Sequence, residues 1–110
     1  MKRVFGFLLL FVVLTSFLSA APQDFDVSFN QALHDLLPES IKKAGVINAA
    51  TSAGSPPYTF YADDNKTIIG GDIDLAYAIG KVLGVDVVFT PLAFAGIIPA
   101  VMSGRFDMSI

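Results

Sequence analysis

The chain has 110 residues, enough for one domain at most, and it contains no cysteine, which excludes disulfides, cysteine-based metal sites and lipid attachment through a cysteine. Its formal net charge is −3 and it has no basic cluster, which argues against nucleic acid as a partner.

The N-terminal 21 residues have the layout of a secretory signal peptide. Lys2 and Arg3 precede an apolar run over residues 4–18, and small residues follow up to Ala21. A membrane anchor is the alternative, but a spanning helix needs about 20 apolar residues and this run is shorter. The sequence therefore predicts export to the periplasm, with cleavage near Ala20 or Ala21.

Residues 22–36 are predicted to form a lead-in and a short helix capped by Ser28. Pro38 breaks this helix and suits the first turn of a second one, which Gly45 ends in the left-handed conformation. His34 has no evident partner, so we interpret it as an exposed surface residue.

A short apolar strand over residues 46–51 comes next, followed by a loop with two prolines and then aromatic residues. Residues 58–62 and 67–69 are predicted to be the arms of a hairpin. The sequence "DDNK" between the arms is interpreted as a solvated turn.

Asp72 and Asp74 precede an apolar helix pattern that ends at Gly84. Paired carboxylates can serve acid/base catalysis or metal binding, but residues two apart on a helix do not converge on one point. We expect Asp72 to be the N-cap and Asp74 to lie in the first turn, where the helix dipole favours negative charge.

The strand "VDVVFTPL" is continuously apolar, which is typical of a strand covered on both faces. A second helix is predicted from about Ala95 to Gly104, with Pro99 in or near its first turn. A third strand begins within "RFDMSI".

This order of elements predicts an α/β fold with a parallel sheet between two helical layers. In such sheets ligands bind beyond the carboxyl ends of the strands, and two segments reach that rim: "TSAGSPPY" and "TPLAF". Neither segment contains a glycine-rich phosphate loop, and the single histidine lies outside the α/β unit. We therefore expect no catalytic residue, metal ligand or cofactor.

Residues 37–110 contain several short motifs in order: "AGV", "PPY", "DDNKT", "GGDIDLA", "LGV" and "FAGIIPAVMSGRFD". No single motif is specific, but the ordered set resembles the N-terminal part of lobe one in the family 3 extracellular solute-binding proteins. These are the periplasmic polar amino-acid-binding proteins of ABC importers. The resemblance implies a periplasmic-binding-protein-like (Venus-flytrap) lobe that is incomplete, so the chain is interpreted as a fragment.

The same resemblance implies a ligand site. In the family, two lobes close on an amino acid, and aromatic residues often stack on its side. Phe94 falls where the family places a cleft aromatic, and Tyr58 on the last position of a "YPPF"-type loop. Ser55 stands where the family usually has tyrosine, Ser52 where an acidic residue is common, and Gly71 where phenylalanine is usual. The expected ligand-binding residues are therefore Phe94, Tyr58, Ser55 and Ser52.

The implied function is capture of an amino acid or similar small polar solute for an ABC transporter permease in the inner membrane, with the complete protein a monomer. The family's ligand-carboxylate arginine comes after residue 110, and Arg105, in the turn before the last strand, lies away from the rim. Alternatives on the same scaffold are an exported enzyme, such as a cyclohexadienyl-type dehydratase, and a sensor module. An enzyme needs an acid/base residue in the cleft, which Asp72 and Asp74 do not supply.

Overall fold

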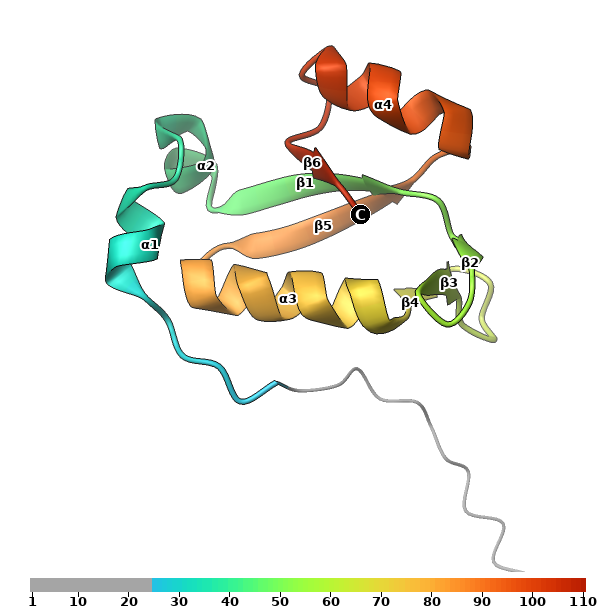
Figure 1. The fold of residues 1–110 in the computed structure, drawn as a ribbon, viewed down its shortest axis with the longest axis horizontal. Helices are drawn as coiled ribbons and strands as arrows, with labels where there is room; N and C mark the ends of the chain where they lie inside the picture. Colours follow the sequence, from blue (N-terminus) through green and yellow to red (C-terminus); the bar gives the residue numbers. More distant parts are fainter. Residues whose placement is uncertain (1–24) are drawn as a thin grey trace, which may run out of the picture.

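A three-stranded parallel sheet lies at the centre of the computed structural model, which describes residues 25–110. Strand β1 (Val46–Thr51) is the middle strand, with β5 (Asp86–Pro91) on one side and β6 (Met108–Ser109) on the other. Helices α3 (Gly71–Leu83) and α4 (Phe94–Met102) cover opposite faces of this sheet (Figure 1). The expected α/β fold with a parallel sheet and helices on both faces is confirmed.

Both faces of β1 contribute buried residues, and each contributes to a different core cluster, although Asn48 is exposed. Ile47 and Ala49 pack toward α3, with Ala76, Val85 and Val87. Ala50 packs toward α4, with Ile97, Ala100 and Phe106. The apolar sequence of β1 thus reflects its central position in the sheet.

Strand β5 differs from the expectation of a strand covered on both faces. Its burial alternates: Val87 is buried against α3, whereas Val88 is 50% exposed. The cause is topological, because β5 is an edge strand and α4 packs on β1 and β6. The apolar run in the sequence does not distinguish an edge strand from a central one.

A second, antiparallel sheet lies beyond the carboxyl end of β1 and comprises β2 (Gly54–Ser55), β3 (Thr59–Tyr61) and β4 (Ile68–Ile69). The predicted hairpin is confirmed as β3 and β4, while β2 is an additional short strand. In the hairpin turn, the Asp64 carboxylate accepts hydrogen bonds from the amides of Lys66 and Thr67, both at 2.8 Å. The turn is exposed, as expected.

The prediction that Asp72 caps α3 is wrong. The N-cap is Gly70, and no side chain caps the helix. The amides of Gly71 and Asp72 instead donate to the carbonyls of Pro57 and Tyr58, at 3.1 and 3.2 Å. These loop carbonyls satisfy donors that a capping side chain would otherwise take. Asp72 and Asp74 both lie in the first turn, so a structural reading of the pair still holds.

The N-terminal helices are α1 (Gln31–Asp35) and α2 (Glu39–Ala44). Asn30, not Ser28, is the N-cap of α1, since its side-chain oxygen accepts from the Leu33 amide at 3.2 Å. Gly45 ends α2 with φ 68°, the left-handed conformation expected from the sequence.

The interpretation of His34 as a surface residue without a partner is also wrong. Its Nδ1 lies 2.7 Å from the Leu83 carbonyl oxygen, and its ring contacts the Phe29 ring edge-on at a centroid distance of 5.7 Å. The residue is half-buried. Its partner is 49 positions away in the sequence, so no local pattern indicates it.

Pro99 lies deeper in α4 than predicted, because the helix begins at Phe94 and Pro99 is its sixth residue. The missing N–H leaves the carbonyl of Ala95 without its helical partner. Both residues are exposed, so solvent can take that bond. Gly104 follows the helix with φ 73°, consistent with the predicted stop.

No helix within residues 25–110 is long and apolar enough to cross a membrane. The predicted signal peptide, residues 1–21, lies outside the described residues.

Candidate functional site

The carboxyl ends of β1 and β5 form one rim of the parallel sheet, because the two strands pair in register from Val46–Asp86 to Thr51–Pro91. The Leu92 amide donates to the Thr51 carbonyl at 2.8 Å and extends this pairing to the rim itself. The segments 52–58 and 92–94 therefore leave the sheet from the same rim, one toward β2 and the other toward α4 (Figure 1). All four predicted ligand-binding residues lie in these two segments.

The segment 52–58 has a fixed backbone. The Thr59 hydroxyl donates to the Ser52 carbonyl at 2.8 Å, and the Tyr58 amide donates to the Ser55 carbonyl at 2.8 Å. The Pro56–Pro57 peptide bond is cis. Ser52 is half-buried and Ser55 is exposed.

Tyr58 and Phe94 are the large aromatic residues of the rim. Tyr58 is 60% exposed and Phe94 is 80% exposed, although the backbone of each is tied to a helix. Phe94 is the first residue of α4, and the Tyr58 carbonyl accepts the Asp72 amide of α3. Aromatic faces open to solvent can bind an apolar group or a cation.

The fit of Tyr58 against α3 depends on Gly70, a residue that the sequence-based predictions did not single out. Gly70 has φ 132°, and a Cβ built there would lie 2.0 Å from the Tyr58 carbonyl oxygen. The double glycine before the helix is the signal that could have identified this close approach.

The rim has little formal charge. The sequence contains no Asp, Glu, Lys, Arg or His from residue 49 to 62 or from 87 to 104. Arg105 lies in the turn before β6, at the opposite end of the sheet, with its guanidinium carbon 5.4 Å from the centre of the Phe106 ring. Within residues 25–110, no three His, Asp or Glu side chains cluster as a metal site.

The resolved pKa shift belongs to a structural turn and not to the rim. Bonds from the Thr67 hydroxyl, the Thr67 amide and the Lys66 amide hold the pKa of the Asp64 carboxyl below its usual value of 3.8. Asp64 is fully exposed and lies in the hairpin turn. It is therefore not a candidate for acid/base catalysis.

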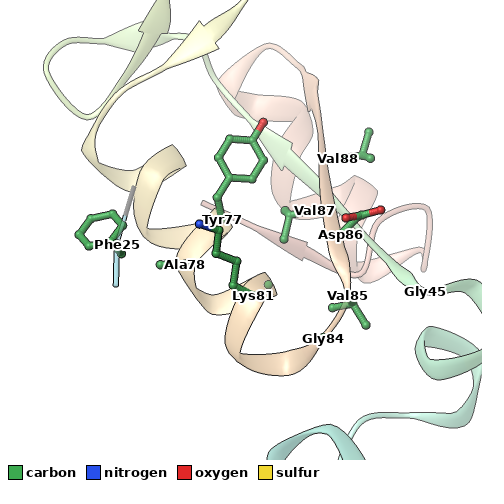
Figure 2. Close-up of a pocket in the computed structure, with 11 residues that line it drawn as sticks. Phe25, Gly45, Tyr77, Ala78, Lys81, Gly84, Val85, Asp86, Val87 and Val88 are labelled. Atoms are coloured by element: carbon green, nitrogen blue, oxygen red, sulfur yellow. The ribbon is translucent and has the colours of Figure 1, made fainter. Parts of the chain in front are cut away.

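A cavity of about 980 Å³ lies away from the rim. It is an open hollow between α3 and the beginning of β5, lined by residues that include Phe25, Tyr77 and Lys81 (Figure 2). A smaller hollow of about 330 Å³ lies between β5 and the hairpin. The rim presents the exposed aromatic residues, so the candidate site rests on those residues rather than on cavity size.

Comparison with known proteins shows that residues 47–110 match the bacterial extracellular solute-binding proteins, family 3. The arginine-binding protein ArgT of Corynebacterium glutamicum is 33% identical over 75 residues, which are 66% of this chain and 24% of the relative. The L-cystine-binding protein TcyA of Bacillus subtilis is 30% identical over 63% of this chain and 26% of the relative. The chain thus spans about a quarter of the length of these curated relatives.

Two solved structures are similar as well. An ancestral cationic amino acid solute-binding protein is 43% identical, with a TM-score of 0.58 over 64% of this chain and 31% of the other. The arginine-bound form of domain 1 from TmArgBP is 32% identical, with a TM-score of 0.61 over 66% of this chain and 59% of the other. Since the family match covers more than half of the residues, the chain belongs to the family 3 bacterial extracellular solute-binding proteins.

Proposed function

We propose that the chain forms part of lobe one in an exported protein that captures an amino acid or similar small polar solute. The observation that carries this proposal is the pair of exposed aromatic residues, Tyr58 and Phe94, on adjacent segments of one sheet rim. Both lie in the region that matches the family. In the proposed complex their ring faces contact the ligand, and Ser52 and Ser55 supply hydroxyl groups.

The named relatives support a ligand of the amino-acid class, since their names specify arginine, cystine and histidine. Domain 1 of TmArgBP was solved with arginine bound, which supports a substantial role for lobe one in holding the ligand. Delivery to an ABC transporter permease, a periplasmic location and a monomeric state are further parts of the proposal.

Calorimetric titration of the full secreted protein with a panel of amino acids tests this function. We expect Phe94→Leu and Tyr58→Leu each to weaken binding by about 2- to 30-fold, because each removes an aromatic face worth roughly 0.5–2 kcal/mol. Met102→Leu is the matched control, since Met102 is 83% exposed at the opposite end of α4. Binding that survives both aromatic substitutions unchanged would exclude the rim as the ligand site.

A second candidate is an exported enzyme. It is favoured by one similar structure, 42% identical with a TM-score of 0.57, which is described as an ancestral amino acid-binding protein and a precursor of cyclohexadienyl dehydratase. Incubating the full secreted protein with a cyclohexadienyl acid and measuring product formation distinguishes the two. Because the rim segments contain no acidic, basic or histidine side chain, we expect no turnover.

A further inference from the structure

The segment from Phe25 to Asn30 runs along α3 on the side away from the sheet (Figure 1). It precedes the family-matched region, which begins at residue 47. Apolar residues alternate with polar ones, as Phe25, Val27 and Phe29. An extended segment with this alternation can place one row of side chains against an apolar surface.

The burial of Ala78 shows that the outer side of α3 is covered at this position. Ala76 and Ala78 are two residues apart, so they point about 200° apart around the helix. Ala76 packs on the sheet and is 1% exposed, yet Ala78 is also only 8% exposed. Phe25 lines the same cavity as Ala78, and Figure 2 shows it on the side of α3 turned away from β5.

The segment is also fastened to the carboxyl end of α3. The Asn30 amide donates to the Val82 carbonyl at 2.8 Å, and His34 Nδ1 donates to the Leu83 carbonyl at 2.7 Å. A carbonyl can only accept, so Nδ1 carries the proton. The final carbonyls of a helix have no partner within it, so these two bonds act as a C-terminal cap.

Phe29 packs against the same end of α3, next to Gly84. Its ring lies so close to Gly84 that a Cβ on Gly84 would approach it to 2.5 Å. Gly84 has φ 66°, and the Phe29 ring also contacts His34 edge-on. Phe29, His34 and Gly84 therefore interlock at the end of α3.

We infer that residues 25–34 form a strap, which shields an apolar outer face of α3 and supplies the hydrogen bonds that end this helix. Ala78 is where the strap covers the helix, and His34 is where it is fastened. The two hydrogen bonds that fasten the strap go to α3, so opening the strap breaks neither a hydrogen bond of the sheet nor its strand pairing. This inference does not depend on the ligand-binding role of the rim.

Hydrogen exchange at the Asn30 amide tests the strap directly, because the partner of this amide is the Val82 carbonyl. In the complete chain, we expect Ala78→Lys to speed this exchange by about tenfold or more, as the loss of one hydrogen bond allows. The matched control is Ile79→Lys on the same helix, since Ile79 is already 43% exposed and should leave the exchange rate unchanged.

His34→Ala removes the hydrogen bond between His34 and the Leu83 carbonyl. We expect it to give a similar increase in the exchange rate of the Asn30 amide. Leu36→Ala is its control, because Leu36 is 80% exposed and close to His34 in sequence. Combining Ala78→Lys with His34→Ala should add little to either, since both open the same element. An Asn30 amide that stays as protected in Ala78→Lys and in His34→Ala as in the unchanged chain would overturn the inference.

Discussion

At the scale of single residues, Gly70 determines how the Tyr58 loop sits on α3. Its φ of 132° disfavours any other residue, and an added Cβ would lie within 3 Å of three backbone atoms of Pro57 and Tyr58. These backbone atoms cannot move aside as the end of a flexible side chain can. The loop would have to move away from α3, and Tyr58 would move with it.

We therefore predict that Gly70→Ala costs stability by about 1–3 kcal/mol and weakens ligand binding at the proposed site. Gly71→Ala is a close control, since a Cβ there meets nothing within 4 Å and the residue is helical. That variant should be neutral or slightly stabilising, because alanine favours helix over glycine. Denaturant unfolding and calorimetry measure both effects, and equal losses in the two variants would contradict this explanation.

Thr51 is a second residue whose surroundings predict a measurable effect. It is fully buried at the end of β1, and its hydroxyl has no hydrogen-bond partner. Thr51→Val keeps the shape and removes the unsatisfied group, so we expect unchanged stability or a gain of up to about 1 kcal/mol.

Thr59→Val is the contrasting variant, because the Thr59 hydroxyl does have a partner, the Ser52 carbonyl. It should cost about 0.5–1.5 kcal/mol. Denaturant midpoints measure both. A loss in Thr51→Val as large as that in Thr59→Val would mean that the Thr51 hydroxyl forms a hydrogen bond in solution.

At the scale of elements, sequence patterns located the regular structure well but not its junctions. Gly45 and Gly84 ended helices as predicted, because a left-handed residue is a local requirement. The sequence did not predict the N-terminus of α3 at Gly70, because the amides after Gly70 bond to a distant loop. It also did not predict the bond from His34, because its partner lies at the end of another helix. Local periodicity contains no information about such contacts.

The candidate site was likewise predicted from the sequence only in part. The location of Tyr58 and Phe94 at one rim follows from strand order and family resemblance, and the strand pairing supports it. Their large exposure, and the dependence of the Tyr58 loop on Gly70, follow only from three-dimensional packing.

The hairpin is the element with a predictable response to pH. The folded pKa of Asp64 is lowered, chiefly by the Thr67 hydroxyl, so its ionised form is favoured by folding. The stabilisation is complete above the unfolded value, near 3.8, and is lost as pH falls through the folded pKa. We expect a carboxyl titration by NMR to place Asp64 below that value. Titration of Asp64 at or above 3.8 would contradict the bonding.

At the scale of the whole molecule, the two edges of the parallel sheet differ. The amides of Asp86 and Leu92 point toward β1, so alternation turns the nitrogens of Val87, Phe89 and Pro91 outward. Proline has no N–H, and Asp86 adds charge, which together discourage pairing at the β5 edge. Strand β6, at the other edge, contains neither a proline nor a charged residue, and α4 packs beside it.

The outer face of α4 predicts how residues 25–110 behave on their own. Phe94, Ile98 and Met102 are four residues apart and 80%, 62% and 83% exposed, so they form one apolar stripe along the helix. A stripe of this kind beside an open sheet edge favours self-association. We predict concentration-dependent association of the isolated chain in sedimentation velocity, and a shift toward monomer when Ile98→Lys and Met102→Lys are combined. Asp86→Lys, at the β5 edge, should leave association unchanged, and a double variant that unfolds would show that this face is packed in solution.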